Sequence, residues 1–395
     1  MGKHGCFSGF IFFIFMSIVS PMCAAADVPG GEACEKKKGL VILVEFPDIP
    51  PRINLEFVRE RFNKLDLYVR AMSYGKVCMD LDITGWHRLP DSMKHYAISA
   101  ANLNVDKGRV SKLIQDAIDA ADAKNDLSRY SFVVLFLGAQ FKEYGMVGLC
   151  GYPGMLGWKH DMVLKTRSGQ VVPGGVAIFT FQAHLGTLFH DIAHVWGGVR
   201  DGKRVLPCLY DHDIQAKHPT HERGFEAALI NMGYWDPLSC HFRQRSLPPP
   251  GLSSWTKLRL GWIAREKVRA VNPAEGAELL VGPLEDGKSE TLVIKIPIDQ
   301  SRYYLVENRQ PIGTFDSILP SKGILIMAAD DKVDECRHGK SPVKLMNAEP
   351  AIPHLQGAAF DLPAKAVFTD RKNGVELRLL ERAGDSYRIR VGRPG

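Results

Sequence analysis

Three strand-like segments that alternate with two helical ones constrain the fold of this chain most. Residues 39–48, "GLVILVEFPD", and residues 130–138, "YSFVVLFLG", are short apolar runs typical of buried strands, and residues 78–90 alternate apolar and polar side chains with the strand period. Residues 55–75 and 108–124 instead carry apolar side chains at helical spacing. This order of strand, helix, strand, helix and strand predicts an α/β amino-terminal half.

The carboxy-terminal part has a different pattern. From about Glu278 onward the chain consists mainly of short strand-like runs. These runs are "TLVIKIPI", "YYLVENR", "GILIMAA", "GVELRLL" and "SYRIRV". We therefore expect a β-rich region over residues 278–393 and, for the whole chain, an α+β fold.

The first 26 residues have the three parts of a secretory signal peptide. A basic start, "MGKHG", precedes the apolar run "FIFFIFMSIV", and Ala24-x-Ala26 supplies a cleavage site. The apolar run is too short for a membrane span, and no later segment has the length of one. We expect residues 1–26 to be removed and the mature protein to be exported, to the periplasm or the outside of the cell, without a membrane span.

The composition limits the kinds of partner that we expect. The 50 basic and 44 acidic residues are spread along the 395-residue chain, which argues against a nucleic-acid partner. Of the eight cysteines, two lie before the cleavage site, and an even number in an exported chain favours disulfides. Cys208 and Cys240 bracket one loop-rich region, so we expect them to pair. The oligomeric state is not predicted.

The segment "LFHDIAHVWGG" carries the chemistry. His190 and His194 are four residues apart in a predicted helix that runs from Phe179 to the two glycines at 197–198, so both face the same way. This is the spacing with which zinc peptidases hold their metal. A catalytic zinc takes a third protein ligand and keeps one position for water, whose pKa it lowers to about 7. Further aspartates follow the helix and are candidates for the third ligand.

Asp191 occupies the place of the general base. In H-E-x-x-H enzymes, the carboxylate after the first histidine takes a proton from the water and passes it to the leaving amine. Aspartate has the same chemistry but is one methylene shorter. A misplacement of about 1 Å can cost about 100-fold in rate.

Several motifs taken together resemble the immune-inhibitor-A-type family of secreted zinc metallopeptidases, from about residue 38 almost to the C-terminus. They are "LVILVEFPD", "SYGKVCMDLDITGWHRLP", "HDIAHVWGG", "LPCLYD", "YWDPLS", "GLSSWTKLRLGWI" and "YYLVENRQPIG" followed by "GILI". The resemblance implies a zincin-like catalytic domain over residues 38–265, a β-rich C-terminal part and hydrolysis of protein or peptide substrates. It makes His190 and His194 zinc ligands and Asp191 the base.

The resemblance leaves the third zinc ligand open, because "VRDGKRV" looks inserted after the helix. Matching the spacing from His194 gives Asp201, which we favour, with Asp211 as the second choice. Matching the "LPCLYD" turn instead gives Cys208 in place of the family's aspartate. In "YWDPLS", Leu238 stands where the family has the methionine of a turn beneath the metal, and this change nearly conserves volume.

The sequence thus predicts an exported zinc metallopeptidase in which His190, His194 and Asp201 bind zinc and Asp191 is the base. Two alternatives remain: a non-catalytic member of the same fold that serves as a binding or scaffold protein, and an α/β protein in which the histidine pair is incidental.

Other residues have competing interpretations. Glu307, Asn308 and Arg309 either bind a substrate terminus or, more commonly for such residues, form a buried polar network between the two halves. The loop histidines at positions 212, 218 and 221 are either extra ligands or solvated side chains. Cys34 is either a latency ligand of the metal or, as we favour, a disulfide partner.

Overall fold

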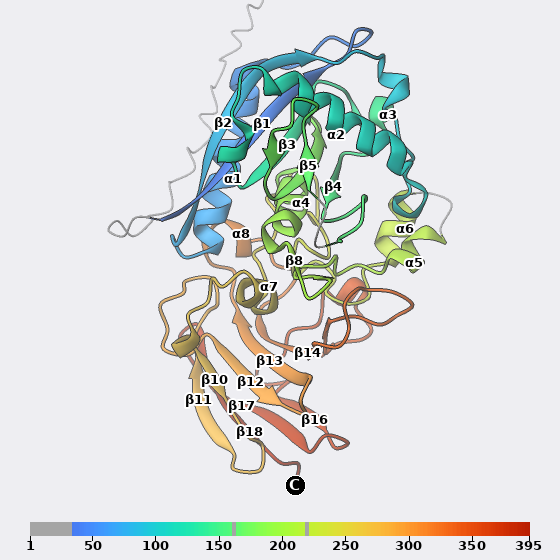
Figure 1. Ribbon diagram of the computed structural model, residues 1–395. Helices are drawn as coiled ribbons and strands as arrows, with labels where there is room; N and C mark the ends of the chain where they lie inside the picture. Colours follow the sequence, from blue (N-terminus) through green and yellow to red (C-terminus); the bar gives the residue numbers. More distant parts are fainter. Residues whose placement is uncertain (1–33, 160–162, 218–220) are drawn as a thin grey trace, which may run out of the picture.

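The computed structural model describes residues 34–159, 163–217 and 221–395, so the predicted signal peptide lies outside the described residues. Figure 1 shows an upper half in which helices surround a sheet and a lower half built of strands. The predicted α+β class is confirmed. In the described part of the chain, no helix has both the length and the apolar character needed to cross a membrane.

A five-stranded sheet organises the upper half, in the order β2-β1-β3-β7-β4. Its strands are β1 (Glu35–Glu45), β2 (Val77–Arg88), β3 (Phe132–Leu137), β4 (Gly148–Tyr152) and β7 (Gly175–Thr180). All neighbours pair in parallel except β4, which runs antiparallel to β7 at one edge. Every residue of β3 and β7 is buried, as expected for central strands covered on both faces.

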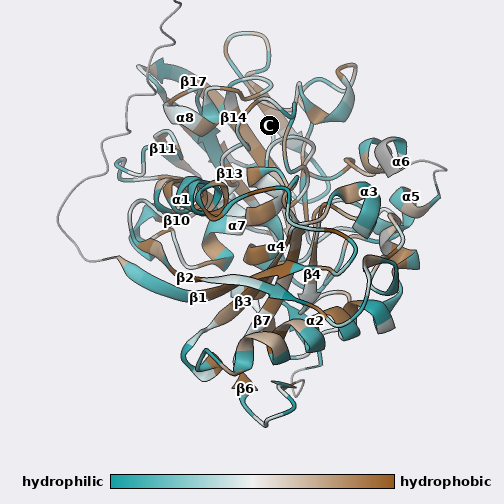
Figure 2. Ribbon diagram, turned by 90° about the horizontal axis from the view of Figure 1, so that it is seen from above, coloured by the Kyte–Doolittle hydropathy of each residue, from teal (hydrophilic) through white to brown (hydrophobic). Residues whose placement is uncertain are grey.

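Three helices cover the two faces of this sheet, as the view from above in Figure 2 shows. Helices α1 (Leu55–Met72) and α4 (Leu185–Gly197) pack into the core on one face, and α2 (Lys107–Asp122) packs into the core on the other. Asn54 and Asp106 cap α1 and α2 by accepting a hydrogen bond from a first-turn N–H group. The predicted strands and the first two predicted helices are confirmed.

The start of the third predicted helix was wrong. The apolar segment from Phe179 does not begin a helix, because Gly175–Thr180 forms strand β7 and α4 begins only at Leu185. The β-branched and aromatic side chains of "GVAIFT" suit a buried strand. The end of the helix at Gly197 and Gly198 is as predicted, and Gly198 takes a positive φ of 62°.

The lower half contains two sheets that face each other. One has the order β10-β12-β13-β14-β15 and the other β11-β18-β17-β16. The strands are β10 (Val268–Ala270), β11 (Ala277–Val281), β12 (Val293–Pro297), β13 (Arg302–Arg309), β14 (Gly323–Asp330), β15 (Val343–Leu345), β16 (Val367–Asp370), β17 (Val375–Ala383) and β18 (Ser386–Gly392). Apolar side chains from both sheets, among them Val306, Leu377 and Ile389, form one core between them.

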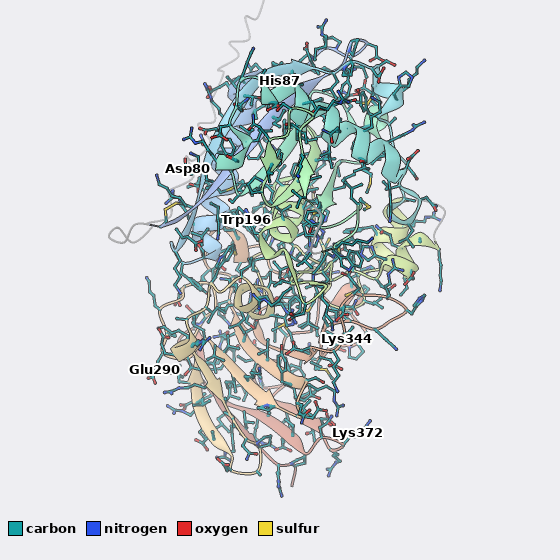
Figure 3. The ribbon with its side chains drawn as sticks, viewed as in Figure 1. Asp80, His87, Trp196, Glu290, Lys344 and Lys372 are labelled. Atoms are coloured by element: carbon teal, nitrogen blue, oxygen red, sulfur yellow. A yellow bond between two sulfur atoms is a disulfide. The ribbon has the colours of Figure 1, made fainter. Side chains whose placement is uncertain are left out.

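The two halves share a hydrophobic core. Phe189 of α4 and Trp255 of α7 (Ser254–Arg259) belong to the same buried cluster as Leu305 and Leu325 of the lower half. Both Trp255 and Trp262 are buried, so the segment "SSWTKLRLGWI" packs onto the core. Figure 3 draws the side chains along the ribbon, with Trp196 labelled in the upper half and Lys344 in the lower half.

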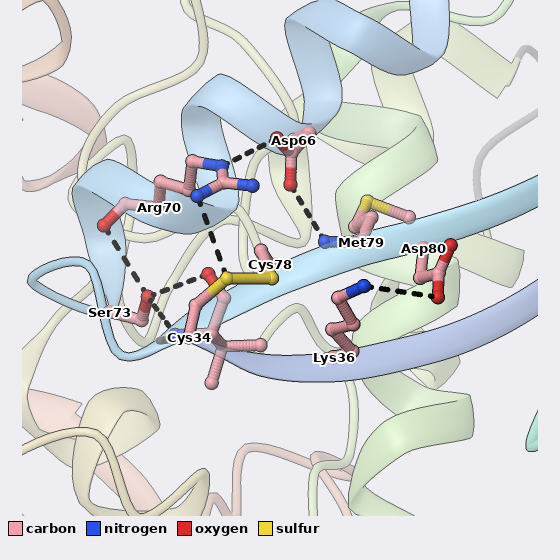
Figure 4. Close-up of a disulfide and its surroundings, with 9 residues drawn as sticks. Cys34, Lys36, Asp66, Arg70, Ser73, Cys78, Met79 and Asp80 are labelled. Atoms are coloured by element: carbon pink, nitrogen blue, oxygen red, sulfur yellow. Dashed lines mark hydrogen bonds and ion pairs between the residues drawn. A yellow bond between two sulfur atoms is a disulfide. The ribbon is translucent and has the colours of Figure 1, made fainter. Parts of the chain in front are cut away.

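One disulfide ties the first strands together. Cys34 and Cys78 are bonded at the start of β1 and β2, and Arg70 of α1 reaches the Cys34 sulfur (Figure 4). The predicted disulfide role of Cys34 is confirmed. The predicted pairing of Cys208 with Cys240 is wrong, because both are free thiols in the structure, as are Cys150 and Cys336.

Candidate metal centre

Helix α4 carries the two histidines into the interior. His184 caps its start by accepting the Gly186 N–H group at Nδ1, at 3.1 Å. Every residue from Gly186 to Val195 is buried, so the helix is enclosed on all sides. His190, Asp191 and His194 are all at most 5% exposed. Three ionisable side chains therefore lie on one turn in an environment poor in water.

Backbone carbonyls fix the orientation of both imidazole rings. His190 Nδ1 lies 2.9 Å from the Pro237 oxygen, and His194 Nδ1 lies 2.6 Å from the Leu206 oxygen. A carbonyl oxygen only accepts, so each Nδ1 carries the proton and each Nε2 presents a lone pair. Burial lowers the pKa of His190 and puts that of His194 well below its usual value, which keeps both rings neutral. Neutral, oriented imidazoles are what a metal requires.

The free Nε2 atoms meet the sulfur of Cys208. The two Nε2 atoms are 3.0 Å apart, and Cys208 Sγ lies 3.6 Å from that of His190 and 3.4 Å from that of His194. Around a tetrahedral zinc with ordinary bond lengths, two nitrogens lie roughly 3.3 Å apart and a nitrogen and a sulfur roughly 3.6 Å. The donor set and its spacing fit a metal, and this buried group could hold a metal ion.

The favoured third ligand, Asp201, lies elsewhere. It is exposed in the turn of a hairpin between β8 (Val199–Arg200) and β9 (Lys203–Arg204), with a positive φ of 52°. The structure thus places Cys208, not Asp201, with the two histidines. Asp-Gly between short extended segments is the sequence signature of a two-residue hairpin turn, and "RDGK" carries that signal.

Asp211, the second choice for the third ligand, instead binds backbone N–H groups. Its side chain caps helix α5 (His212–Ala216) by accepting the N–H groups of Asp213 and Ile214, and its other oxygen accepts that of Gly339 at 2.7 Å. Its carboxylate accepts three backbone N–H groups, and it lies outside the group formed by His190, His194 and Cys208.

Polar neighbours favour the thiolate form of Cys208. Burial opposes ionisation, but the charge and hydrogen bond of His212, together with the charge of Arg204, outweigh it and lower the pKa of the thiol. Tyr210 also hydrogen-bonds Cys208, and burial, followed by the charge of Cys208, raises the pKa of its hydroxyl well above the usual value. Tyr210 therefore remains a protonated donor. Thiolate is the form of cysteine that binds metals.

Asp191 lies on the side of helix α4 that faces strand β4. Burial raises the pKa of its carboxyl to about 7, against the opposing effect of His190. Strand β4 approaches closely here, since a Cβ added to Gly148 would lie 2.9 Å from Asp191 Oδ2. A carboxyl group with a pKa near neutrality next to a group that could hold a metal ion is well suited to accept and release a proton.

A cavity of about 690 Å³ opens over the group. The edge strand β4 forms one wall, from Gly148 to Cys150, and Phe225 and Phe242 line it elsewhere. Apolar side chains dominate the wall, among them Leu103, Phe141, Met146, Leu149, Met155, Trp158 and Leu229, while Arg243, Arg245, Arg337 and Lys107 also line it. This size and mixture suit part of an extended, amphipathic ligand.

Two functional candidates escaped the sequence interpretation. The His241 ring lies 4.3 Å from that of His190, and its Nδ1 lies 3.0 Å from Thr187 Oγ1. The buried Arg204 guanidinium makes a two-point ion pair with Glu335, at 2.8 and 2.6 Å, on the cavity wall. Neither contact has a local sequence signal, because the partners are far apart along the chain.

Of the predicted loop histidines, His212 lines the cavity and stacks edge-on against Tyr210 at 4.9 Å. Residue 218 lies outside the described residues. No family model matches the chain, and a search of curated proteins finds no match.

Proposed function

We propose that this protein is an exported zinc-dependent metallopeptidase in which His190, His194 and Cys208 bind the metal. The convergence of two bare imidazole nitrogens and a thiol on one point, beside Asp191 and beneath a large cavity, carries this proposal. Three protein donors leave one position open, which is the arrangement of catalytic rather than structural zinc sites. Imidazole and thiolate together favour zinc over the harder divalent cations.

Zinc in such a site supplies Lewis-acid chemistry, since it acidifies water and polarises a carbonyl group. The remaining work falls to the chain. Asp191 takes a proton from the attacking water at a carboxylate oxygen and passes it to the nitrogen of the leaving amine. Burial raises the pKa of this carboxyl, which favours its holding the proton between the two transfers. His241 lines the same cavity and offers a donor for the negative charge that develops on the carbonyl oxygen.

The edge strand explains how a peptide would be held. Strand β4 pairs with β7 on one side, and its residues Gly148, Leu149 and Cys150 line the cavity. An extended peptide can add to such an edge through backbone hydrogen bonds, with alternate side chains entering the apolar pocket. The substrate class is therefore an extended polypeptide with a bulky apolar side chain near the cleaved bond.

The cysteines bear on the compartment of the protein and on the metal ligand. The Cys34–Cys78 disulfide supports export, because such bonds persist in oxidising compartments. Four buried cysteines of the described residues are free, and Cys208 is the one that we propose as a metal ligand.

The main alternative is a non-catalytic protein of the same architecture that binds peptides. It is favoured by one feature of the sequence, the shorter carboxylate of Asp191 in place of glutamate. The metal centre would then organise the cavity without turnover.

Metal content and peptide cleavage of the purified mature chain test the proposal. We expect one equivalent of zinc, cleavage of an extended peptide library, and loss of both in His190→Ala. The isosteric Asp191→Asn variant should keep the zinc and lose cleavage. Zinc without cleavage in the wild-type protein, with cleavage only in Asp191→Glu, would establish the non-catalytic alternative. Absence of stoichiometric metal would overturn the metal centre itself.

A further inference from the structure

The carbonyl that orients His190 belongs to a segment held by buried polar side chains. His190 Nδ1 lies 2.9 Å from the oxygen of Pro237, in the turn that follows Trp235. On one side of this proline, Leu238 N–H binds Asp236 Oδ1 at 2.8 Å, and on the other the Trp235 oxygen accepts a bond from Arg309. The position of the His190 ring therefore depends on what fixes residues 235–238.

Asp236 is the first anchor of this turn. Its Oδ2 atom accepts the N–H group of Ser253 at 3.0 Å, the Ser253 hydroxyl at 2.6 Å and the Thr256 hydroxyl at 2.7 Å. Asp236, Ser253 and Thr256 are all inaccessible to solvent. A buried carboxylate with four donors is held in one place, since moving it would break several charge-assisted hydrogen bonds at once.

Arg309 is the second anchor, and it comes from β13 in the β-rich half. Its Nε and Nη2 atoms each donate to Asp316 at 2.7 Å, and Nη1 donates to Glu307 at 3.2 Å. The remaining contacts are to two backbone oxygens, Trp235 and Gly251, each at 3.1 Å. These contacts use all five N–H groups of a guanidinium.

The network continues into helix α7. Glu307 accepts the N–H group of Ser254 at 2.6 Å, and Ser253 caps the same helix through Thr256 N–H. Glu307, Arg309 and Asp316 have no solvent exposure. The predicted buried polar network between the halves is thus present, and it ends at the backbone segment beside a metal-ligand histidine.

We propose that Arg309 and Asp236 are positioning residues of the metal centre, through which the β-rich half sets the orientation of His190. This inference rests on the proposed metal site but not on peptidase activity. A buried ion-pair network is a poor source of stability, because desolvation offsets most of its attraction. It does restrict geometry, and outer-shell partners of metal-bound histidines typically affect metal affinity by about 10–100-fold.

The test compares two neighbouring residues of β13. Arg309→Lys keeps the positive charge, but its single nitrogen carries three N–H groups and cannot keep the five contacts that the guanidinium makes from three nitrogens. Asn308→Ala is the matched control: Asn308 is equally buried, but its side chain bonds Val281, Asp385 and Gln310, all in the β-rich half. Adjacent strand residues point to opposite faces, so the control leaves the turn at 235–238 alone.

Zn²⁺ affinity by chelator competition and the absorption spectrum of the Co²⁺-loaded protein are the measurements. We expect Arg309→Lys to weaken Zn²⁺ binding at least about tenfold and to shift the Co²⁺ bands. Asn308→Ala should keep the wild-type Zn²⁺ affinity and Co²⁺ spectrum, even if its melting temperature falls as much as that of Arg309→Lys. Equal effects of both variants on affinity, or no effect of Arg309→Lys, would overturn the proposal.

A milder variant keeps the test decisive if Arg309→Lys does not fold. Thr256→Val removes one hydroxyl from Asp236 and nearly conserves shape. It should weaken Zn²⁺ binding in the same direction by a smaller factor. In the metal-free protein, the His190 Nδ1–H proton should exchange with solvent faster in Thr256→Val than in wild type. Unchanged exchange and unchanged affinity would reduce the network to a structural link. Wild-type protein that binds peptide but no Zn²⁺ would instead refute the metal centre.

Discussion

Cys208 Sγ lies 3.4 Å from His194 Nε2, in the third position of the group, for which the sequence predicted an aspartate. The β8–β9 hairpin produces this outcome. It sends the chain out to Asp201 and back, and the Leu206 oxygen then reaches His194 Nδ1 at 2.6 Å. Cys208 follows two residues later and points at the two histidines. The return of the chain after this short hairpin thus fixes the tautomer of His194 and brings Cys208 to the two histidines.

The first prediction separates Cys208 from Asp201. Cys208→Ala removes a donor atom, so we expect its Zn²⁺ affinity to fall by more than about 100-fold, the upper end of the cost of losing an outer-shell partner. Asp201→Ala should bind Zn²⁺ as the wild type does, because its side chain is exposed in a turn. Chelator competition measures both. A loss of affinity in Asp201→Ala alone would restore the aspartate as ligand.

The Gly148→Ala variant tests whether the cleavage rate depends on the position of the Asp191 carboxylate. A Cβ at Gly148 would lie 2.8 Å from side-chain atoms of Phe179 and Thr187 and 2.9 Å from Asp191 Oδ2. Gly148→Ala should therefore displace the carboxylate and lower the cleavage rate about 100-fold, while zinc stays bound because Asp191 is not a ligand. Gly85→Ala, where nothing lies within 4 Å of the new atom, is the control. Wild-type activity in Gly148→Ala would contradict a role of Asp191 in cleavage.

Local sequence patterns predicted much of the fold and the two histidines of the candidate site. The spacing of His190 and His194 is a property of five consecutive residues, and a helix converts it directly into a shared face. Strand β7 and helix α4 were harder to separate, because both are apolar and a short apolar run alone does not distinguish them. The cap at His184 marks the boundary in the structure, and histidine is not among the usual capping residues.

The third ligand and the outer partners depend on contacts between distant residues. The Asp201-Gly202 pair predicts a hairpin turn, but not where the chain after the hairpin returns. Likewise Arg309 reaches Trp235 across 74 residues of sequence. Such contacts depend on how distant segments of the chain pack together. The periodicity of a single helix or strand does not predict this packing.

His184 makes a pH-dependent contribution to stability. Burial lowers its pKa from 6.5 to about 4. Its neutral ring accepts the Gly186 N–H group at Nδ1, which a protonated ring could not do. The unfolded chain takes up this proton below about pH 6.5, whereas the folded protein does so only near pH 4. Stability should therefore be fully present above the higher value and fall as the pH drops between the two.

His184→Asn measures this contribution, because asparagine caps helices and does not titrate. Urea unfolding at several pH values should show wild-type protein losing about 2 kcal/mol more than the variant as pH falls to 4, a figure that allows for the partly exposed ring. Parallel stability curves for the two proteins would show that His184 titrates normally in the folded state.

The Cys34–Cys78 disulfide should stabilise the first two strands by restricting the unfolded chain. It closes a loop with a sequence separation of 44, which contains all of α1, and in the chain-entropy treatment such a loop is worth about 4 kcal/mol. Urea unfolding of metal-free protein should show a loss of about 2–4 kcal/mol in the Cys34→Ala, Cys78→Ala double variant. A phosphine reductant should lower wild-type stability to the same level and leave the double variant unchanged. If the reductant destabilises both proteins equally, its effect comes from another bond and the stabilising role of this disulfide is refuted.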